Sequence, residues 1–199
     1  MAKSRQDQEV FWVQPKERGV IELDDFHVPR SMRKLLRQEP FEIRINTAFN
    51  DVIEGCAESG PGRNDTWINE KILALFVDLH RAGLAHSVEA WRGDSLVGGL
   101  YGLSMGAAFF GESMFTREAN ASKYALCHLA AIMRAGDYRL LDTQFITDHL
   151  KQFGAVEIAH DDYMAKLGDA LGHMGRFEGP LSYSEIKRVL FSQWSTQTS

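Results

Sequence analysis

The chain has 199 residues, of which 44% are hydrophobic and 25% are charged, and its formal net charge is −5. This composition is typical of a globular protein that buries a substantial core, and it excludes a disordered chain or a protein coated in basic residues. The chain has no run of about eighteen apolar residues, and its N-terminus is mostly polar. We therefore expect neither a membrane span nor a secretory signal, and we place the protein in the cytoplasm.

The two cysteines, Cys56 and Cys127, lack the spacing of metal ligands. In a chain without an export signal they are expected to be free, buried thiols. The sequence predicts no zinc site or other metal centre and no disulfide framework.

Residues 1–40 are predicted to form a small N-terminal subdomain. It begins as an extended, turn-rich segment with Pro15 and Gly19 as breakers, and residues 20–23 are a possible short strand. After Pro29, basic side chains recur at the i, i+3, i+4 and i+7 positions of one helix face. These residues are Arg30, Arg33, Lys34 and Arg37. This basic stripe has two interpretations, a solvated helix face or a patch that contacts nucleic-acid phosphates.

Residues 41–199 are predicted to form the larger domain. Strict alternation predicts a half-buried strand at residues 41–45, and apolar residues at helical spacing predict an amphipathic helix that follows Trp67 and stops at Gly83. A capping residue is expected just ahead of Trp67. The other predicted elements are a helix at 51–56, strands at 86–91, 96–103 and 107–110, a helix at 120–135, a strand at 139–144, a helix at 147–152, a strand at 156–158 and a helix at 161–171, followed by a less regular tail.

The order of these elements predicts the fold class. A helix, three antiparallel strands and then alternating helices and strands indicate an α/β (α+β) protein with a mixed sheet flanked by helices, as in acyl-CoA N-acetyltransferase-like folds. The turn ahead of the central helix, residues 117–122, lacks the glycines that let backbone amides close around a pyrophosphate. An acetyl-coenzyme A donor is therefore disfavoured, and no cofactor is expected.

Two polar stretches are predicted to meet around one cleft, Phe-Gly-Glu-Ser-Met-Phe at residues 110–115 and Leu-Asp-Thr-Gln at 141–144. Asp142 and Gln144 are two apart on a strand, so they are expected to share a face and to act together on one bound group in acyl chemistry. The alternative is a polar pair on a solvated strand face. Ser113 beside Glu112 does not indicate a serine hydrolase, because no G-x-S-x-G elbow and no obvious histidine partner accompany it.

Seven stretches of the chain carry a resemblance to a known family. They are Asp65-Thr-Trp-Ile-Asn69, His86-Ser-Val-Glu-Ala-Trp91, Leu96-Val-Gly-Gly-Leu-Tyr-Gly102, Phe109-Phe-Gly-Glu-Ser-Met-Phe115, Ala121-Ser-Lys-Tyr-Ala-Leu126, Leu141-Asp-Thr-Gln-Phe145 and His149-Leu-Lys-Gln-Phe-Gly-Ala155. In this order they closely resemble the bacterial leucyl/phenylalanyl-tRNA–protein transferases. A weaker similarity extends over most of the chain.

The resemblance implies a reaction and its partners. Members of that family move Leu or Phe, and less readily Met, from tRNA onto proteins whose N-terminal residue is Arg or Lys, which marks these proteins for degradation. The implied partners are aminoacyl-tRNA and such acceptor proteins, with no membrane partner, and we expect a monomer. The acetyltransferase-like domain of the family does not use coenzyme A, in agreement with the turn at residues 117–122.

The resemblance also assigns roles to residues of the cleft. The residues that match Asp142 and Gln144 are the proposed catalytic pair of the family. Glu112 and Ser113 lie in a matching segment and are assigned to the substrate site, where Glu112 either holds the amino group of the donor or is a buried structural carboxylate. The pocket for a Leu or Phe side chain would be formed by Leu100, Phe109, Met114 and Leu141, each of which is alternatively a plain core residue.

The resemblance also implies contacts with the tRNA. Trp67 and Trp12 match aromatic positions of the family and are expected to stack on the terminal adenine. The basic stripe is then a tRNA contact. The chain departs from the family at its start, where a polar leader replaces a further helix and turn, so the N-terminal subdomain is expected to be shortened. Two alternatives to the implied function are an acetyltransferase-like enzyme with another acyl donor and an inactive tRNA-binding module.

Overall fold

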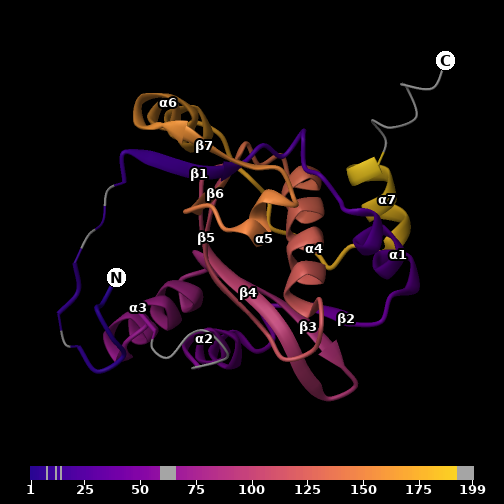
Figure 1. The fold of residues 1–199 in the computed structure, drawn as a ribbon, viewed down its shortest axis with the longest axis horizontal. Helices are drawn as coiled ribbons and strands as arrows, with labels where there is room; N and C mark the ends of the chain where they lie inside the picture. Colours follow the sequence, from indigo (N-terminus) through magenta and orange to yellow (C-terminus); the bar gives the residue numbers. More distant parts are fainter. Residues whose placement is uncertain (8, 12, 14, 59–65, 192–199) are drawn as a thin grey trace.

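The structure is a computed structural model that describes residues 1–7, 9–11, 13, 15–58 and 66–191 (Figure 1). Its strands are β1 (Glu17–Ile21), β2 (Glu42–Ile45), β3 (Ala85–Arg92), β4 (Ser95–Met105), β5 (Ala108–Thr116), β6 (Leu140–Gln144) and β7 (Ala155–Ala159). Its helices are α1 (Arg30–Gln38), α2 (Phe49–Ala57), α3 (Glu70–Arg81), α4 (Ala121–Ala135), α5 (Asp148–Lys151), α6 (His160–Leu171) and α7 (Tyr183–Phe191).

The described strands form one sheet in the order β2-β3-β4-β5-β6-β1-β7. Strands β2 to β5 are an antiparallel meander, β5 and β6 are parallel, and β1 runs antiparallel to both β6 and β7. The sheet is therefore mixed, and the predicted α/β fold class is confirmed. The division at residue 40 stays a prediction, although β1 from the predicted N-terminal part lies inside the sheet of the larger part.

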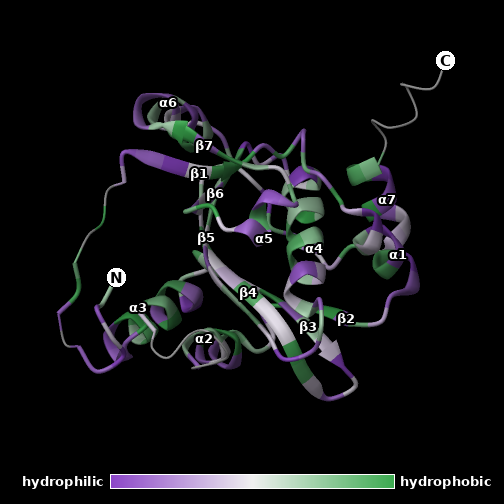
Figure 2. Ribbon diagram, in the orientation of Figure 1, coloured by the Kyte–Doolittle hydropathy of each residue, from purple (hydrophilic) through white to green (hydrophobic). Residues whose placement is uncertain are grey.

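Helices cover both faces of the sheet. Helix α4 has twelve buried residues among its fifteen and packs on β3, β4 and β5, with α1 and α7 against its outer side. Helices α2 and α3 form a second core with β3 and β4, and they lie apart from α4 in Figure 1. Figure 2 shows hydrophobic residues along α4 and β4, whereas β1 begins with hydrophilic residues and ends with apolar ones.

Several predicted elements have different bounds in the structure. Strand β5 continues to Thr116 instead of ending at Phe110, because β4 offers it pairing partners as far as Gly98. Helix α3 is capped by Asn69, whose side chain accepts the backbone N–H of Ile72 at 2.9 Å, and not by a residue ahead of Trp67. Residues 59–66 have the composition of a loop, and all of them except Thr66 lie outside the described residues.

Helix α7 in the tail was not predicted. It has a weak local signal, but Ile186 and Leu190 are buried against the core that contains α4. Cys56 and Cys127 are both buried, as predicted, and neither belongs to a disulfide. Among the described residues, none of the helices combines the length and the apolarity that crossing a membrane requires.

His128 on α4 is a buried titratable group that the cleft does not use. Within the described residues neither ring nitrogen has a hydrogen-bond partner, and the ring lies 4.7 Å from that of Tyr124. Burial lowers the pKa of His128 to about 3. In the unfolded chain the pKa is about 6.5, so between these values the unfolded chain binds the extra proton and acid destabilises the fold.

We predict that His128→Leu makes the protein less sensitive to acid. Because the unfolded chain binds a proton at His128 that the folded chain does not, the free energy of unfolding at about pH 5 should be about 2 kcal/mol lower than at neutral pH. The leucine variant has no imidazole at this position and should not show this loss. Denaturant unfolding at both pH values measures the difference. His27→Leu, at an exposed histidine, is the control and should keep the acid sensitivity of the parent. Equal acid sensitivity of His128→Leu and the parent would contradict the prediction.

Candidate active site

Glu112 is aimed by an irregularity in the pairing of β4 and β5. Gly102 pairs with Gly111 and Tyr101 pairs with Ser113, so Glu112 is an extra residue on β5. Such β-bulges redirect side chains and are common next to active sites. The carboxylate of Glu112 is largely buried, and this burial raises its pKa, although the hydrogen bond from Gln144 opposes the shift.

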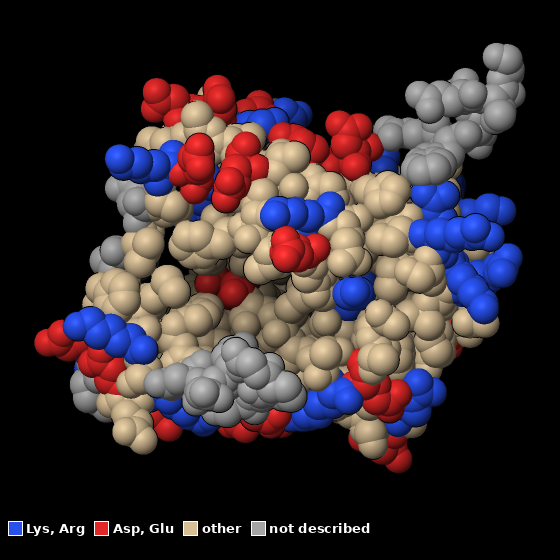
Figure 3. Space-filling view, viewed as in Figure 1, with Lys and Arg blue, Asp and Glu red and all other residues tan. Residues whose placement is uncertain are grey.

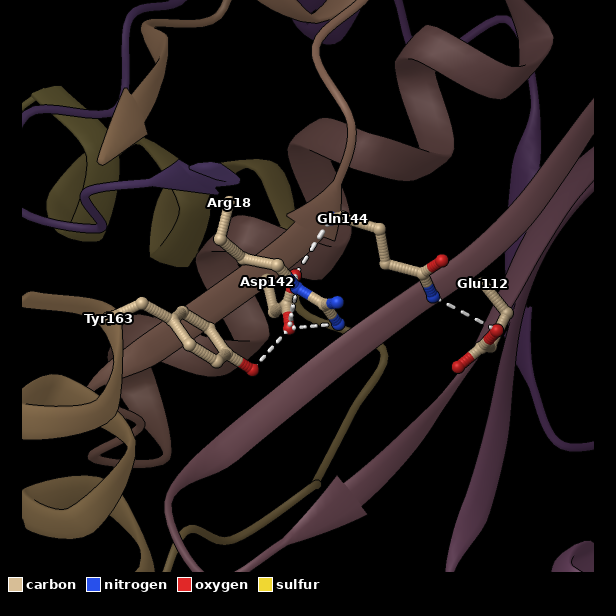
Figure 4. Close-up of polar contacts among 5 residues, drawn as sticks. All are labelled: Arg18, Glu112, Asp142, Gln144 and Tyr163. Carbon is tan, nitrogen blue, oxygen red and sulfur yellow. Dashed lines mark hydrogen bonds and ion pairs between the residues drawn. The ribbon is translucent and has the colours of Figure 1, made fainter. Parts of the chain in front are cut away.

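Gln144 lies at the end of β6, where a second irregularity occurs. Gly19 pairs with Gln144 and Val20 pairs with Asp142, so Thr143 is the extra residue on β6. Gln144 has a φ of 64°, in the left-handed region that non-glycine residues seldom adopt. Simple strand alternation therefore does not describe how Asp142 and Gln144 are arranged. The Gln144 side chain extends toward β5, and its Nε2 donates to Oε2 of Glu112 at 3.1 Å (Figure 4).

Asp142 is fully buried, and its carboxylate accepts hydrogen bonds from three residues. Its Oδ1 accepts the backbone N–H of Gln144 at 2.7 Å, and its Oδ2 accepts the hydroxyl of Tyr163 at 2.6 Å. Arg18 from β1 donates Nε to both oxygens, at 3.0 Å each, and Nη2 to Oδ2 at 2.8 Å. Burial and the bond to Asp142 raise the pKa of Tyr163, which therefore keeps its proton and acts as a donor.

These contacts change the interpretation of the predicted pair. The structure brings Asp142 and Gln144 together, but the Asp142 side chain is 0% exposed, and it is turned toward Arg18 and Tyr163 (Figure 4). Gln144 alone of the two lines the cavities described next. Both oxygens of Asp142 are bonded within the protein, so in this geometry only Gln144 of the pair faces the cavities. The joint action of the pair on one bound group stays a prediction.

A cavity of about 740 Å³ lies beside Gln144 and Glu112, within the range of small-molecule sites. Of the predicted site residues, it is lined by Trp67, Leu100, Glu112, Ser113, Met114, Leu141 and Gln144. Residues that sequence reasoning missed complete its wall, among them Leu126, Leu129, Thr143, Phe145, His149 and Leu150. Only the tertiary fold brings these positions on β6, α4 and α5 to one cavity.

Phe109 is a correction to the predicted pocket. It is 0% exposed, does not line this cavity, and stacks on Phe177 at a ring distance of 5.4 Å. Phe109 lies on β5 ahead of the bulge at Glu112, where it packs into the core with α4. The alternative reading of Phe109 as a plain core residue is the correct one. Trp12 lies outside the described residues.

A smaller cavity of about 290 Å³ adjoins the larger one. Five residues line both cavities and therefore lie at their boundary, namely Met1, Trp67, Glu112, Gln144 and Phe145. Arg18 and apolar residues of α3 form much of the smaller cavity. Figure 3 shows this face hollowed, with an acidic side chain inside the hollow, and Glu112 is the acidic residue common to both cavities. The described residues contain no cluster of three or more potential metal ligands.

The basic stripe is confirmed as one face of a helix, α1. Arg30, Lys34 and Arg37 are exposed, and Figure 3 shows Lys and Arg side chains gathered over α1 and α7. Arg33 differs from the other three because its Nε donates to the carbonyl of Val28 at 2.8 Å and its guanidinium lies 5.8 Å from the ring of Phe191. Arg33 therefore serves packing at least in part.

Comparison with known proteins decides the family. The model of the leucyl/phenylalanyl-tRNA protein transferase family matches residues 20–168. The chain belongs to this family. Leucyl/phenylalanyl-tRNA–protein transferases of Rhodospirillum rubrum and Maricaulis maris are 58% and 56% identical to it, over 89% and 100% of this chain and 83% and 91% of their own length. The predicted family is confirmed, and with it the predicted reaction class, that of an aminoacyltransferase.

Solved structures are more distant from this transferase. L-PGS from Bacillus licheniformis aligns with a TM-score of 0.46 at 10% identity, over 88% of this chain and 65% of that one. A conserved protein of unknown function from Staphylococcus epidermidis aligns with a TM-score of 0.43 at 14% identity, over 72% and 57% of the two chains.

Proposed function

We propose that this protein transfers Leu or Phe, and less readily Met, from aminoacyl-tRNA to the α-amino group of proteins that begin with Arg or Lys. The acceptors are thereby marked for degradation, and the enzyme acts as a monomer in the cytoplasm. One observation carries this proposal beyond family membership. The amide of Gln144 is fixed by Glu112 at the boundary between an apolar cavity and a second, smaller cavity. The aminoacyl donor and the acceptor amine can therefore occupy separate cavities, with the Gln144 amide between them.

The larger cavity suits the donor amino acid and the end of its tRNA. Leucine and methionine side chains form much of its wall, and they favour an apolar side chain that is unbranched at Cβ over Val or Ile, which are bulky there. Trp67 lies at the boundary of the two cavities, where its ring can stack on the terminal adenine. Ser113 lines the same cavity, and Glu112 offers a carboxylate to the amino group of the donor.

The orientation of the Gln144 amide follows from its partner. Gln144 turns Nε2 toward Glu112 and donates to Oε2 at 3.1 Å, so the carboxyl group of Glu112 is the acceptor that orients the amide. The Oε1 of Gln144 is then left to accept an N–H of the attacking amine. An amide is not a base at neutral pH, so Gln144 orients the amine and relays its proton without keeping it.

The chemistry balances without a covalent enzyme intermediate. The acceptor nitrogen forms a bond to the ester carbonyl carbon of the donor, the bond from that carbon to the ribose oxygen breaks, and the proton lost by the amine ends on the ribose oxygen. The ester is already activated, so positioning and electrostatic stabilisation supply the catalysis.

The test of the proposed function uses Leu-tRNA and two peptides that differ only in a first residue of Lys or Ala. Labelled leucine should appear on the Lys peptide alone, detected by mass spectrometry as an added N-terminal residue. Leucine on neither peptide, with tRNA binding intact, would indicate the inactive tRNA-binding module. Transfer from leucyl-coenzyme A, but not from Leu-tRNA, would indicate an enzyme with another acyl donor.

The exposed basic residues of α1 give a further prediction. Lys34→Glu combined with Arg37→Glu should weaken transfer from Leu-tRNA and lower the salt slope of binding by about one per lost phosphate contact. A small aminoacyl-adenosine donor has no tRNA body, so its use should stay unchanged. Rates with both donors at several salt concentrations measure the effect.

A matched double reversal on another exposed helix is the control. Lys71→Glu with Arg81→Glu on α3 changes the net charge equally and should leave both donors unaffected. Equal losses for the tRNA and the small donor in the α1 variant would count against a tRNA contact on this helix.

A further inference from the structure

A buried ion pair joins the first strand to the catalytic strand. Arg18 and Asp142 are 124 positions apart in the chain, and three hydrogen bonds of 2.8 to 3.0 Å connect them. The side chain of Arg18 is 19% exposed and that of Asp142 is 0% exposed. Arg18 lies just outside the residues that the family model matches. No role for Arg18 follows from the sequence.

The pair has a consequence for the geometry of Gln144. Asp142 bonds the backbone N–H of Gln144 at 2.7 Å, just where the chain takes a φ of 64°. A left-handed conformation at a non-glycine residue persists only when its surroundings hold it. The holding group is a carboxylate, and a carboxylate without exposure needs a cation and further donors to replace its lost hydration. Arg18 supplies the cation, and Tyr163 supplies one more donor at 2.6 Å.

Arg18 is also close to the reacting groups. It lines the smaller cavity together with Glu112 and Gln144, while its guanidinium lies over the ring of Tyr163 at 5.2 Å. The aromatic ring and the two oxygens of Asp142 fix the plane of the guanidinium. Hydrogen bonds therefore connect the guanidinium of Arg18 to the carboxylate of Asp142, and that carboxylate to the backbone N–H of Gln144.

We propose that Arg18 is a positioning residue for aminoacyl transfer, which acts through Asp142 to hold Gln144 in its working conformation. Tyr163 supports the same carboxylate from α6. This inference rests on the proposed function. Strand β1 thereby takes part in catalysis, because it carries Arg18, the cation that neutralises the buried carboxylate of Asp142 on β6.

The main experiment compares Arg18→Ala and Arg18→Lys with the parent, using the small aminoacyl-adenosine donor and an Arg-starting peptide. A loosened Gln144 should lower kcat by about 10-fold to 100-fold in Arg18→Ala, as a small misplacement of a catalytic group does. The KM of the donor should change by less than about threefold, since Arg18 is not assigned to donor binding. Arg18→Lys keeps the charge without the two-pronged geometry, and its kcat should lie between the other two.

Chemical rescue separates positioning from mere stability. Added guanidinium at millimolar concentration should restore part of kcat in Arg18→Ala, because the cavity of about 290 Å³ adjoins the vacated side chain. Arg44→Ala is the matched control, since Arg44 on β2 makes an equally short two-pronged pair with Glu42 at 2.8 and 3.0 Å. It should keep the kcat of the parent, and guanidinium should have no effect on it.

The outcomes decide separately on the inference and on the proposed function. A parent enzyme that transfers nothing to the peptide refutes the proposed function. A folded Arg18→Ala protein with the kcat of the parent, beside an active parent, overturns only the role of Arg18. If Arg18→Ala does not fold, Arg18→Lys decides: an unchanged kcat overturns the proposal, and a lowered kcat at constant KM supports it.

Discussion

Replacing Gln144 by alanine will slow the transfer of leucine from tRNA to an Arg-starting peptide by at least ~10²-fold, the usual effect of losing a proton-transfer or oxyanion group. Gln144 is the polar side chain that both lines the two cavities and has its amide oriented, through the 3.1 Å bond to Glu112. The alanine variant loses the acceptor for the attacking amine. Single-turnover transfer from a saturating donor measures the step directly.

Gln144→Glu distinguishes an orienting amide from a general base. A glutamate at this position would face the carboxylate of Glu112 at hydrogen-bond distance, so the two like charges would repel or share one proton. We expect this variant to be slow as well. A rate equal to that of the parent, or faster, would show that a base is needed at this position, and unchanged transfer by Gln144→Ala would remove Gln144 from the mechanism.

Replacing Asp142 by asparagine will lower both stability and transfer. The change leaves the guanidinium of Arg18 without its counter-charge in a site where Asp142 is 0% exposed. Breaking a buried pair by removing one partner costs about 3–5 kcal/mol. The asparagine keeps the size of the side chain, so the loss reports charge and hydrogen bonding more than packing. Denaturant unfolding gives the stability, and kcat is compared at equal concentrations of folded protein.

Asp169→Asn is the control for this prediction. Asp169 pairs with Arg139 at 2.9 Å, but both side chains are about half exposed, so its loss should destabilise the protein far less than the loss of Asp142. Equal stability losses in the two variants would contradict the importance of the buried pair. A stable Asp142→Asn protein with full activity would show that Gln144 does not depend on the carboxylate.

Two extra residues in the sheet create the geometry on which these predictions rest. Glu112 bulges from β5 and Thr143 from β6, and β5 and β6 are neighbours in the sheet. The bulge on β5 directs a carboxylate toward the cleft, and the irregular end of β6 brings an amide across to meet it. The two side chains would otherwise follow the alternation of their own strands.

Much of the fold was predictable from local pattern. The helices that became α3 and α4 and the strands that became β3 and β4 lie close to their predicted bounds, because their periodicity and their glycine stops are strong local signals. The C-terminal helix α7 and the second half of β5 were not predicted. Helix α7 depends on α4, a partner distant in sequence. The second half of β5 pairs with the neighbouring strand β4, but it lies beyond a register shift that interrupts the simple alternation of a strand.

The sequence predicted which residues belong to the candidate site, but not the contacts that they make. Residue types and their resemblance to a family indicated Glu112, Asp142 and Gln144, and the structure brings them together, as it does Leu100, Met114 and Leu141. Phe109 was assigned to the pocket by resemblance alone, whereas in the structure it packs into the core. Arg18 and Tyr163 were missed because they meet Asp142 only through tertiary contacts.

The sequence by itself determined the fold class, the family and the chemical groups of the cleft, since these depend on local periodicity and on residue identity. Only the tertiary structure decided the roles of those groups. It buried Asp142 against Arg18 and left Gln144 at the cavities, and it set the orientation of the Gln144 amide through Glu112. The physical reason is that burial, bulges and long-range ion pairs arise from how strands pair in space, which no local pattern in a chain specifies.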